Sequence, residues 1–142
     1  MKALQILLFF YTTVIYGQSA GWSSFYSFGE ITAVYTGGDG QVYGVAENSI
    51  FSYDPRANEV VPITTVDGLL GDEIGALAVT DDFMLVGYSN GMLGIHNLID
   101  KSVTLDNSIQ RNFSINPSNK TIHSFLVHDQ TLYISAGYGI SI

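Results

Sequence analysis

Short runs of β-branched and aromatic residues alternate with polar turn residues along most of this chain. From Ile31 onward, each run is bounded by Gly, Asn or Asp, and no stretch keeps a helical period of apolar positions for longer than two turns. Alternation of this kind is typical of short β-strands joined by tight turns. The pattern therefore predicts an all-β chain.

One motif recurs three times: an isoleucine, any residue, a small residue and an apolar residue. Its copies begin at Ile31, Ile74 and Ile122, so the spacings are 43 and 48 residues. An apolar pair follows each start by ten or eleven residues, and another apolar position comes eight residues after the first member of the pair. The pairs are Val42-Tyr43, Met84-Leu85 and Leu132-Tyr133, and the later positions are Ile50, Met92 and Ile140. Repeats of this length, with about four short strands each, are typical of β-propeller blades.

The repeats also predict where the strands lie. We expect strands at 31–36, 41–46, 49–53, 74–80, 83–88, 91–96, 122–128 and 131–136, and fourth strands near 59–65 and 102–105. The small residues Ala33, Ala76 and Ser124 are expected on the innermost strands, where neighbouring blades crowd together. The Asn90-Gly91 pair favours the positive φ angles of a tight hairpin.

These strands amount to an incomplete β-propeller of about two and a half to three blades, each of four antiparallel strands. A propeller ring uses typically 4 to 8 blades, so we expect further blades beyond Ile142. Residues 22–142 are thus interpreted as the truncated N-terminal part of a propeller domain. A repeat array cut open exposes an apolar face, so we expect this segment alone to fold poorly.

The first 20 residues have the layout of a secretory signal peptide. Lys2 precedes an apolar run over 3–16, and the small residues Gly17, Ser19 and Ala20 follow. A membrane anchor is the alternative, but this run is shorter than the roughly 20 apolar residues that span a bilayer. We expect cleavage near 17/18 or 20/21 and no transmembrane helix in the mature chain.

Composition narrows the class of protein further. The chain has no cysteine, which excludes disulfides and thiolate metal sites, so the fold relies on burial and backbone pairing. Loss of Lys2 with the signal peptide leaves four basic side chains against 13 acidic ones, a net charge of −9. Nucleic acid is not expected as a partner, because its phosphates are bound by Lys and Arg.

The segment Asp67–Ile74, together with Val86–Met92, resembles the propeller repeats of two-component regulators. Those repeats carry a Gly-Leu turn, an acidic residue, an Ile-led inner strand and a Gly-rich hairpin. More narrowly, the chain resembles the PorZ N-terminal propeller domains of the type IX secretion system of Bacteroidota. The residues that carry this resemblance are Trp22, Tyr26-Ser27-Phe28, Tyr88-Ser89-Asn90-Gly91, Lys120-Thr121-Ile122, Leu132-Tyr133-Ile134-Ser135 and Gly139-Ile140.

The resemblance implies a cell-envelope protein that works beside a sortase, which cleaves secreted cargo and attaches it to anionic lipopolysaccharide. It also implies further blades and a C-terminal sorting domain. We therefore expect a non-catalytic module, exported to the periplasm or the outer-membrane surface, with the sortase as protein partner and lipopolysaccharide as a second candidate. The alternative is the exported sensor propeller of a hybrid two-component regulator that binds a carbohydrate-derived ligand.

A third class, an enzyme, is ranked last, although propellers host lyases and glycosidases. Gly87-Tyr88-Ser89-Asn90-Gly91 fits the Gly-x-Ser-x-Gly pattern of a hydrolase, in which a helix must follow the serine. Here a predicted strand follows, and the repeats place Glu47 and Gly137 where Ser89 stands. A hairpin turn is the better interpretation. We expect no catalytic, cofactor-binding or metal-binding residue in this segment.

The remaining polar residues are interpreted structurally. His123 and His128 are five apart, which on a strand places them on opposite faces, and His96 lies elsewhere in the chain. The acidic residues expected in turns, where they stabilise the bend, are Asp39, Asp81, Asp82 and Asp129. Asn112-Phe113-Ser114 and Asn119-Lys120-Thr121 match the glycosylation sequon, by chance if the source is bacterial. An aromatic cluster of Trp22, Phe25, Tyr26 and Phe28 has two interpretations: an ordinary packed strand, or the outer strand of the last blade.

Overall fold

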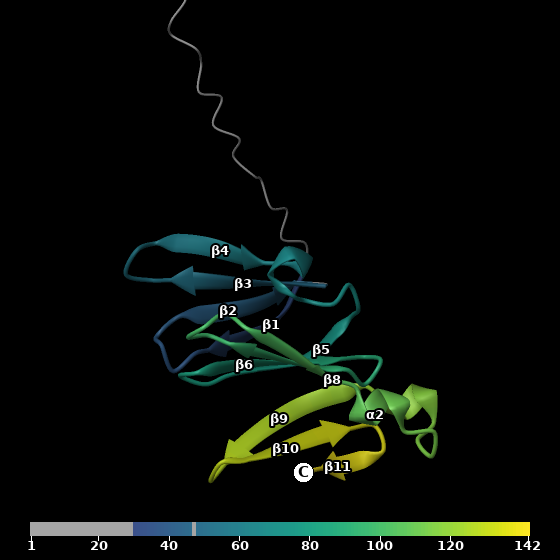
Figure 1. Cartoon of the computed structure of the whole chain (residues 1–142). Helices are drawn as coiled ribbons and strands as arrows, with labels where there is room; N and C mark the ends of the chain where they lie inside the picture. Colours follow the sequence, from purple (N-terminus) through teal and green to yellow (C-terminus); the bar gives the residue numbers. More distant parts are fainter. Residues whose placement is uncertain (1–29, 47) are drawn as a thin grey trace, which may run out of the picture.

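The computed structural model describes residues 30–46 and 48–142, and these build three antiparallel sheets packed side by side (Figure 1). The first sheet consists of β1 (Ile31–Thr36), β2 (Val42–Ala46), β3 (Ser49–Asp54) and β4 (Glu59–Ile63). The second consists of β5 (Ile74–Val79), β6 (Phe83–Tyr88), β7 (Leu93–Asn97) and β8 (Val103–Asp106). The third consists of β9 (Ile122–His128), β10 (Thr131–Ala136) and β11 (Gly139–Ser141).

Each sheet is a meander in which neighbouring strands in sequence are also neighbours in space. The first strand of every sheet faces the first strand of the next, since β5 lies against both β1 and β9. Meanders stacked through their first strands are the blades of a β-propeller, so the predicted fold class is confirmed. The predicted strands are also found, except that the strand predicted over 91–96 begins only at Leu93. The expected signal peptide and the aromatic cluster at Trp22, Phe25, Tyr26 and Phe28 lie outside the described residues.

Helical structure in the described part of the chain is confined to the connections between blades. The elements are η1 (Thr65–Asp67), α2 (Ser108–Arg111) and η2 (Pro117–Asn119). Each is at most one turn long. None of the described helices is long and apolar enough to span a membrane.

The repeated motif corresponds to a β-bulge at the start of each inner strand. The pairing register shifts between Ile31 and Ala33, and it shifts again between Ile74 and Ala76. In the third blade, Ala136 pairs with Ile122 and Ser135 pairs with Ser124, which leaves His123 as the extra residue. The same irregularity occurs in three copies: the residue after each isoleucine is the one that the bulge leaves unpaired, so strand pairing does not restrict its identity.

One landmark of the sequence repeat is displaced by a residue in the second blade. Ile50 pairs with Val45, and Ile140 pairs with Ser135. The residue at the corresponding place in β7 is Leu93, which pairs with Gly87, so the structural counterpart of Ile50 and Ile140 lies one residue after Met92. The cause is a longer hairpin, in which the backbone NH of Tyr88 bonds to the carbonyl of Met92 and Gly91 takes a φ of 84°.

The second sheet is buried on both faces, and each face belongs to a separate apolar cluster. Buried members of the cluster shared with the first sheet include Tyr43, Val45, Ile50, Leu77, Met84, Val86 and Tyr88. Buried members of the cluster shared with the third sheet are Ala76, Leu85, Leu93, Ile122 and Ile134. Successive residues of β6 alternate between the clusters, as the two-residue period of a strand requires. Burial of such side chains stabilises the stack by roughly 1.5–3 kcal/mol each.

The three small residues of the repeat differ in burial. Ala76 is buried between blades, and Ala33 is half-buried against the first cluster, as expected for crowded inner strands. Ser124, in contrast, is exposed. The expectation of crowding at Ser124 is not met in the described structure, because no described blade lies on that side of β9.

Candidate functional site

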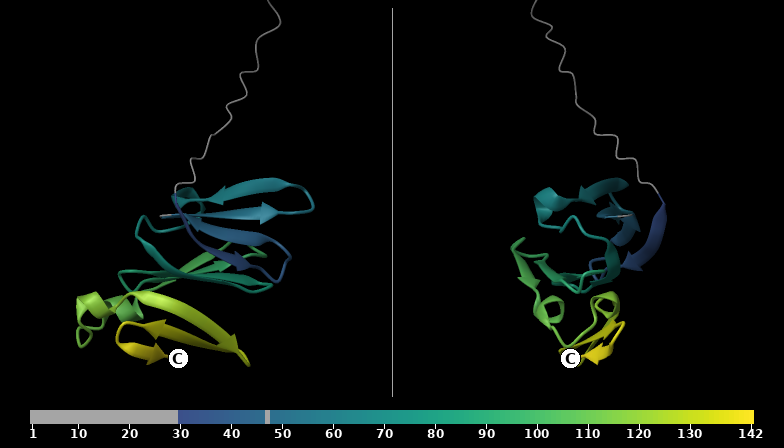
Figure 2. Two further views of the ribbon diagram at one scale, coloured as in Figure 1. Left: turned by 180° about the vertical axis from the view of Figure 1, so that it is seen from behind. Right: turned by 90° about the vertical axis from the view of Figure 1, so that its right-hand side faces the viewer.

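The connections between blades and the hairpins after β6 and β10 gather at one end of the stack, which we call the connection face (Figure 2). It comprises residues 64–73, 88–92, 107–121 and 136–139. Hydrogen bonds link these segments: the Thr121 hydroxyl donates to the Ser89 carbonyl over 3.0 Å, and the Asn90 amide donates to the Asp72 carboxylate over 2.7 Å. Hydrogen bonds therefore hold the segments of the connection face to one another.

The largest feature of the connection face is residues 107–121, the excursion that joins β8 to β9. It is 15 residues long, whereas the connection between β4 and β5 is ten residues long. This difference equals the difference between the repeat spacings of 43 and 48 residues. In Figure 1 the excursion, which contains α2, projects beyond the ends of the strands.

Local hydrogen bonds define the path of the excursion. Asp106 accepts bonds from the backbone NH of Ser108 over 2.7 Å and from its hydroxyl, and these bonds lower the pKa of the Asp106 carboxyl. The Asn112 side chain accepts from the Ser114 NH over 3.0 Å, which makes an Asx turn at the tip. The Asn116 side chain makes an equivalent bond with the NH of Ser118.

The base of the excursion is fixed to the second blade. Lys120 is 8% exposed, and its amine donates to the carbonyl of Gln110 across the excursion. Gly91 accommodates this base: a Cβ atom built on Gly91 would lie 3.0 Å from Ile109 Cγ2 and 3.1 Å from Lys120 Cβ. The two ends of the excursion are thus joined to each other and seated on the β6–β7 hairpin.

A second candidate lies between the outer halves of the first two blades. This interblade cleft has a volume of about 880 Å³ and is lined by residues of both sheets and of η1. Its charged lining residues are Asp39, Asp67, Asp81 and Lys101. The excess of carboxylates makes the cleft a poor binding site for an anionic ligand.

Two buried titratable side chains line the interblade cleft. The Tyr43 hydroxyl donates to the Asp39 carboxylate over 2.9 Å; burial raises the pKa of Tyr43 above its usual range, and the bond to Asp39 raises it further. His96 is 5% exposed, and its Nε2 atom has no hydrogen-bond partner. Burial lowers the pKa of His96, an effect that the negative charge of Asp67 opposes.

A smaller hollow of about 370 Å³ lies along the inner strands. Glu73, Thr121 and His123 contribute its polar side chains near the start of β5 and β9, and Thr32 contributes from β1. His123 is the bulge residue of β9. The hollow that it lines lies along the inner strands, which surround the central channel in a propeller.

Ser89 occupies the hairpin between β6 and β7, as the sequence predicted. Its backbone NH donates to the carbonyl of Glu73, and β7 begins four residues later, at Leu93. A strand rather than a helix follows the serine, so the geometry is that of a hairpin and not of a nucleophile elbow. The absence of catalysis at Ser89 remains a prediction.

The other predicted turn and strand residues are placed as follows. Asp39, Asp81, Asp82 and Asp129 all lie in the turns that follow the inner strands. Asp129 and Gln130 both have positive φ, 46° and 64°, which is the conformation of a type I′ hairpin turn. His123 and His128 lie at opposite ends of β9, and His128 instead pairs with Asp129 at 3.2 Å. Within the described residues, no three acidic or histidine side chains are grouped so as to hold a metal.

The sequons both lie in the excursion. Asn112 and Asn119 are exposed, and the side-chain oxygen of Asn112 is engaged in its Asx turn. The excursion was not predicted from the sequence as a feature of the connection face. Two features of the sequence could have predicted it: the second repeat is longer than the first, and residues 107–128 contain no acidic side chain.

Comparison with known families decides the assignment of the chain. A family model for the N-terminal β-propeller domain of PorZ, from the type IX secretion system (TSS9), matches residues 42–142. The chain belongs to the PorZ N-terminal β-propeller family. The match begins at β2, although β1 completes the same blade in the structure. No curated protein matches the chain.

Solved structures share the propeller fold. The extracellular domain of BT4673 from B. thetaiotaomicron, described as a putative one-component or hybrid two-component system, has TM-scores of 0.57 and 0.58 at 16% identity over 79% and 78% of this chain. The computationally designed Ika4 protein has a TM-score of 0.57 at 14% identity over 79% of this chain and 64% of its own. The chain spans only 14% of the BT4673 domain in each case.

Proposed function

We propose that this chain is part of a non-catalytic, exported docking module of the type IX secretion machinery. The match of residues 42–142 to the PorZ N-terminal propeller family carries this proposal. The fold is consistent with it, because stacked blades form a rigid body whose connections vary without disturbing the sheets. Similarity to an extracellular propeller domain supports an exported location.

The proposed partner is the sortase that processes and anchors secreted cargo. Anionic lipopolysaccharide is a second candidate, but 13 acidic side chains against five basic ones oppose its direct capture by this segment. Contact with glycan is therefore assigned to other blades or to local hydrogen bonds.

Deletion of the gene tests the proposal. Cells that lack the full-length protein are expected to accumulate unprocessed cargo and to release it instead of anchoring it at the surface. A tagged full-length protein, expressed at its native level, is expected to co-purify with the sortase. Normal cargo maturation and attachment in the deletion strain would contradict the proposal.

A sensor function is the second candidate, favoured by the structural similarity to the BT4673 extracellular domain. In that case the chain would bind a carbohydrate-derived ligand and signal across the membrane. The reading frame after Ile142 separates the two: a membrane helix followed by a histidine kinase indicates the sensor, and an immunoglobulin-like sorting domain indicates secretion.

A further inference from the structure

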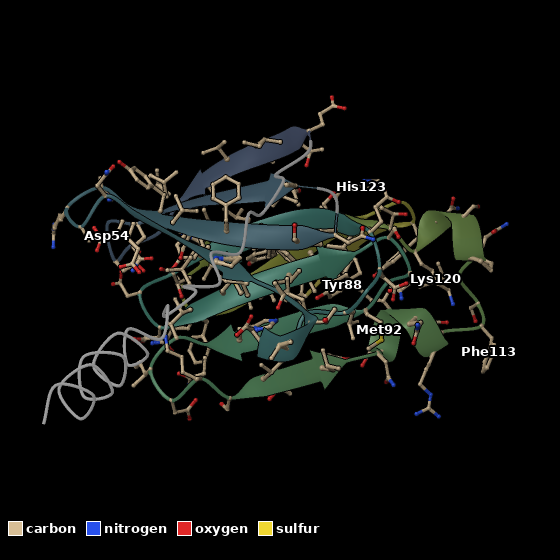
Figure 3. The ribbon with its side chains drawn as sticks, turned by 90° about the horizontal axis from the view of Figure 1, so that it is seen from above. Asp54, Tyr88, Met92, Phe113, Lys120 and His123 are labelled. Carbon is tan, nitrogen blue, oxygen red and sulfur yellow. The ribbon has the colours of Figure 1, made fainter. Side chains whose placement is uncertain are left out.

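Phe113 lies at the tip of the excursion and is 99% exposed. Figure 3 shows its ring at the edge of the molecule, pointing away from the sheets. A large apolar side chain that stays in water does not stabilise the fold, because its contribution to the free energy of folding comes from burial. Packing within the described residues therefore gives the Phe113 side chain no stabilising role.

The tip that carries Phe113 is preorganised. The Asn112 side chain accepts from the Ser114 NH, and the NH of Ile115 bonds to the carbonyl of Asn112 over 3.3 Å. Lys120 and Gln110 close the excursion at its base. Fixing a loop in advance reduces the entropy lost when it binds, so an ordered tip suits a binding role better than a loose one would.

The excursion also differs in charge from the rest of the chain. Residues 107–121 contain Arg111 and Lys120 and no acidic side chain, whereas the remainder has three basic side chains against 13 acidic ones. Arg111 is exposed and stands two residues before Phe113. Because Lys120 is buried at the base, Arg111 is the charge that the tip presents, and it favours a partner whose contact surface is acidic.

The shape of the tip distinguishes a protein partner from a small ligand or a glycan. Sites for small molecules are concave and enclose the ligand, but Phe113 projects from a convex tip. The tip combines a projecting aromatic ring with an exposed arginine two residues before it, and aromatic residues and Arg are enriched in protein interfaces.

We propose that the tip of the excursion is a protein-docking anchor: Phe113 inserts into an apolar pocket of the partner, and Arg111 pairs with a carboxylate at the rim of that pocket. This inference rests on the proposed function, because it names the part of the propeller that contacts the protein partner.

The test measures binding of purified full-length protein to the purified sortase. Phe113→Ser is expected to weaken binding by roughly tenfold to a hundredfold, as loss of an interface anchor does. Arg111→Glu is expected to weaken binding as well, and more strongly at low salt because exposed charges are screened at high salt. Phe113→Leu keeps a large apolar side chain for the pocket and is expected to retain most of the affinity.

Two matched controls come from the same chain. Val66 in η1 is 94% exposed, so Val66→Ser removes an equally exposed apolar side chain from the other connection. Arg56 lies in the exposed turn between β3 and β4, so Arg56→Glu makes the same change of charge as Arg111→Glu, away from the excursion. Both variants are expected to bind as the unaltered protein does.

The outcomes separate this inference from the proposed function. No binding of the unaltered protein to the sortase would refute the proposed partner itself. Binding that is unchanged by Phe113→Ser would refute the anchor alone. A lower melting temperature for Phe113→Ser would show that another part of the chain covers the ring, and loss of lipopolysaccharide binding without loss of sortase binding would make the tip a glycan site. Either result overturns the inference.

Discussion

Gly87 of β6 packs directly against Ile122, the first residue of β9. A Cβ atom built on Gly87 would lie 2.4 Å from Ile122 Cγ2 and 2.8 Å from Phe125 Cζ, so the position has no room for a side chain. Ile122 is fully buried and also lies beside β5, where its carbonyl oxygen would be 2.4 Å from a Cβ on Gly75. The junction of the second and third blades therefore depends on the two glycines that face this isoleucine.

Gly87→Ala is expected to destabilise this junction by about 1–3 kcal/mol, the usual cost of overpacking a core. Hydrogen exchange of the β6 and β9 amides in the full-length protein measures the effect. Gly71→Ala is the matched control, because nothing lies within 4 Å of its added methyl group and the change in unfolded-chain entropy is the same. Equal protection in the two variants would contradict the packing described for Gly87.

Tyr88→Phe is expected to destabilise the second blade by about 1 kcal/mol. The Tyr88 ring is fully buried, and its hydroxyl accepts a 3.0 Å bond from the NH of Leu70 in the connection that enters the blade. Removal of the hydroxyl leaves that partly buried NH without its partner. Equilibrium urea unfolding of the full-length protein measures the change.

The control for Tyr88→Phe is Tyr53→Phe. The Tyr53 hydroxyl bonds to Asn58 at an exposed site over 3.1 Å, so its loss is expected to change stability by less than about 0.5 kcal/mol. If both variants lose the same stability, the Tyr88 hydroxyl does not fasten the connection to the blade.

Ser89 is expected to remain unlabelled when the full-length protein is treated with a fluorophosphonate probe. The serine lies in a hairpin, and its backbone groups are engaged by Glu73 and Thr121. Mass spectrometry of the peptide that contains Ser89 provides the measurement, with an authentic serine hydrolase as the positive control. Stoichiometric modification at Ser89 would revive the hydrolase interpretation.

The repeated isoleucine motif made the strand pattern predictable, because the β-bulge and the packing of inner strands impose it on each blade. The predicted strands at 31–36, 83–88, 122–128 and 131–136 coincide with β1, β6, β9 and β10. The strand predicted over 91–96 was misplaced at its start, because the hairpin has one extra residue and β7 begins at Leu93. Spacing alone does not distinguish an insertion in a hairpin from one in a strand.

Candidate sites were harder to predict than strands, because they depend on contacts between distant residues. Tyr43 and His96 line the same cleft although 53 positions separate them in the sequence. Exposure of Phe113 also follows from three-dimensional arrangement, since an apolar residue between polar ones is compatible with either a buried or an exposed position. The length and the charge of the excursion, in contrast, can be read directly from the sequence.

His96 is expected to make stability depend on pH in the acid range. Its pKa is lowered in the folded state, mainly by burial, so below about pH 6.5 the unfolded chain binds a proton that the folded chain resists. The contribution of neutral His96 to the free energy of unfolding is therefore fully present at pH values above the pKa of this histidine in the unfolded chain. This contribution decreases as the pH falls toward the pKa of His96 in the folded protein, by at most about 1.4 kcal/mol per pH unit.

His96→Gln removes the titrating group from a cleft that also contains Asp39, Asp67, Asp81 and Lys101. We expect its free energy of unfolding to fall less steeply between pH 7.5 and pH 5 than that of the unaltered protein. His128→Gln is the control, because the His128 side chain is 69% exposed and lies at the end of β9, away from the interblade cleft. Urea unfolding at a series of pH values gives the three curves. If the His96→Gln curve runs parallel to that of the unaltered protein, burial of a neutral His96 between the first two blades does not contribute to the pH dependence.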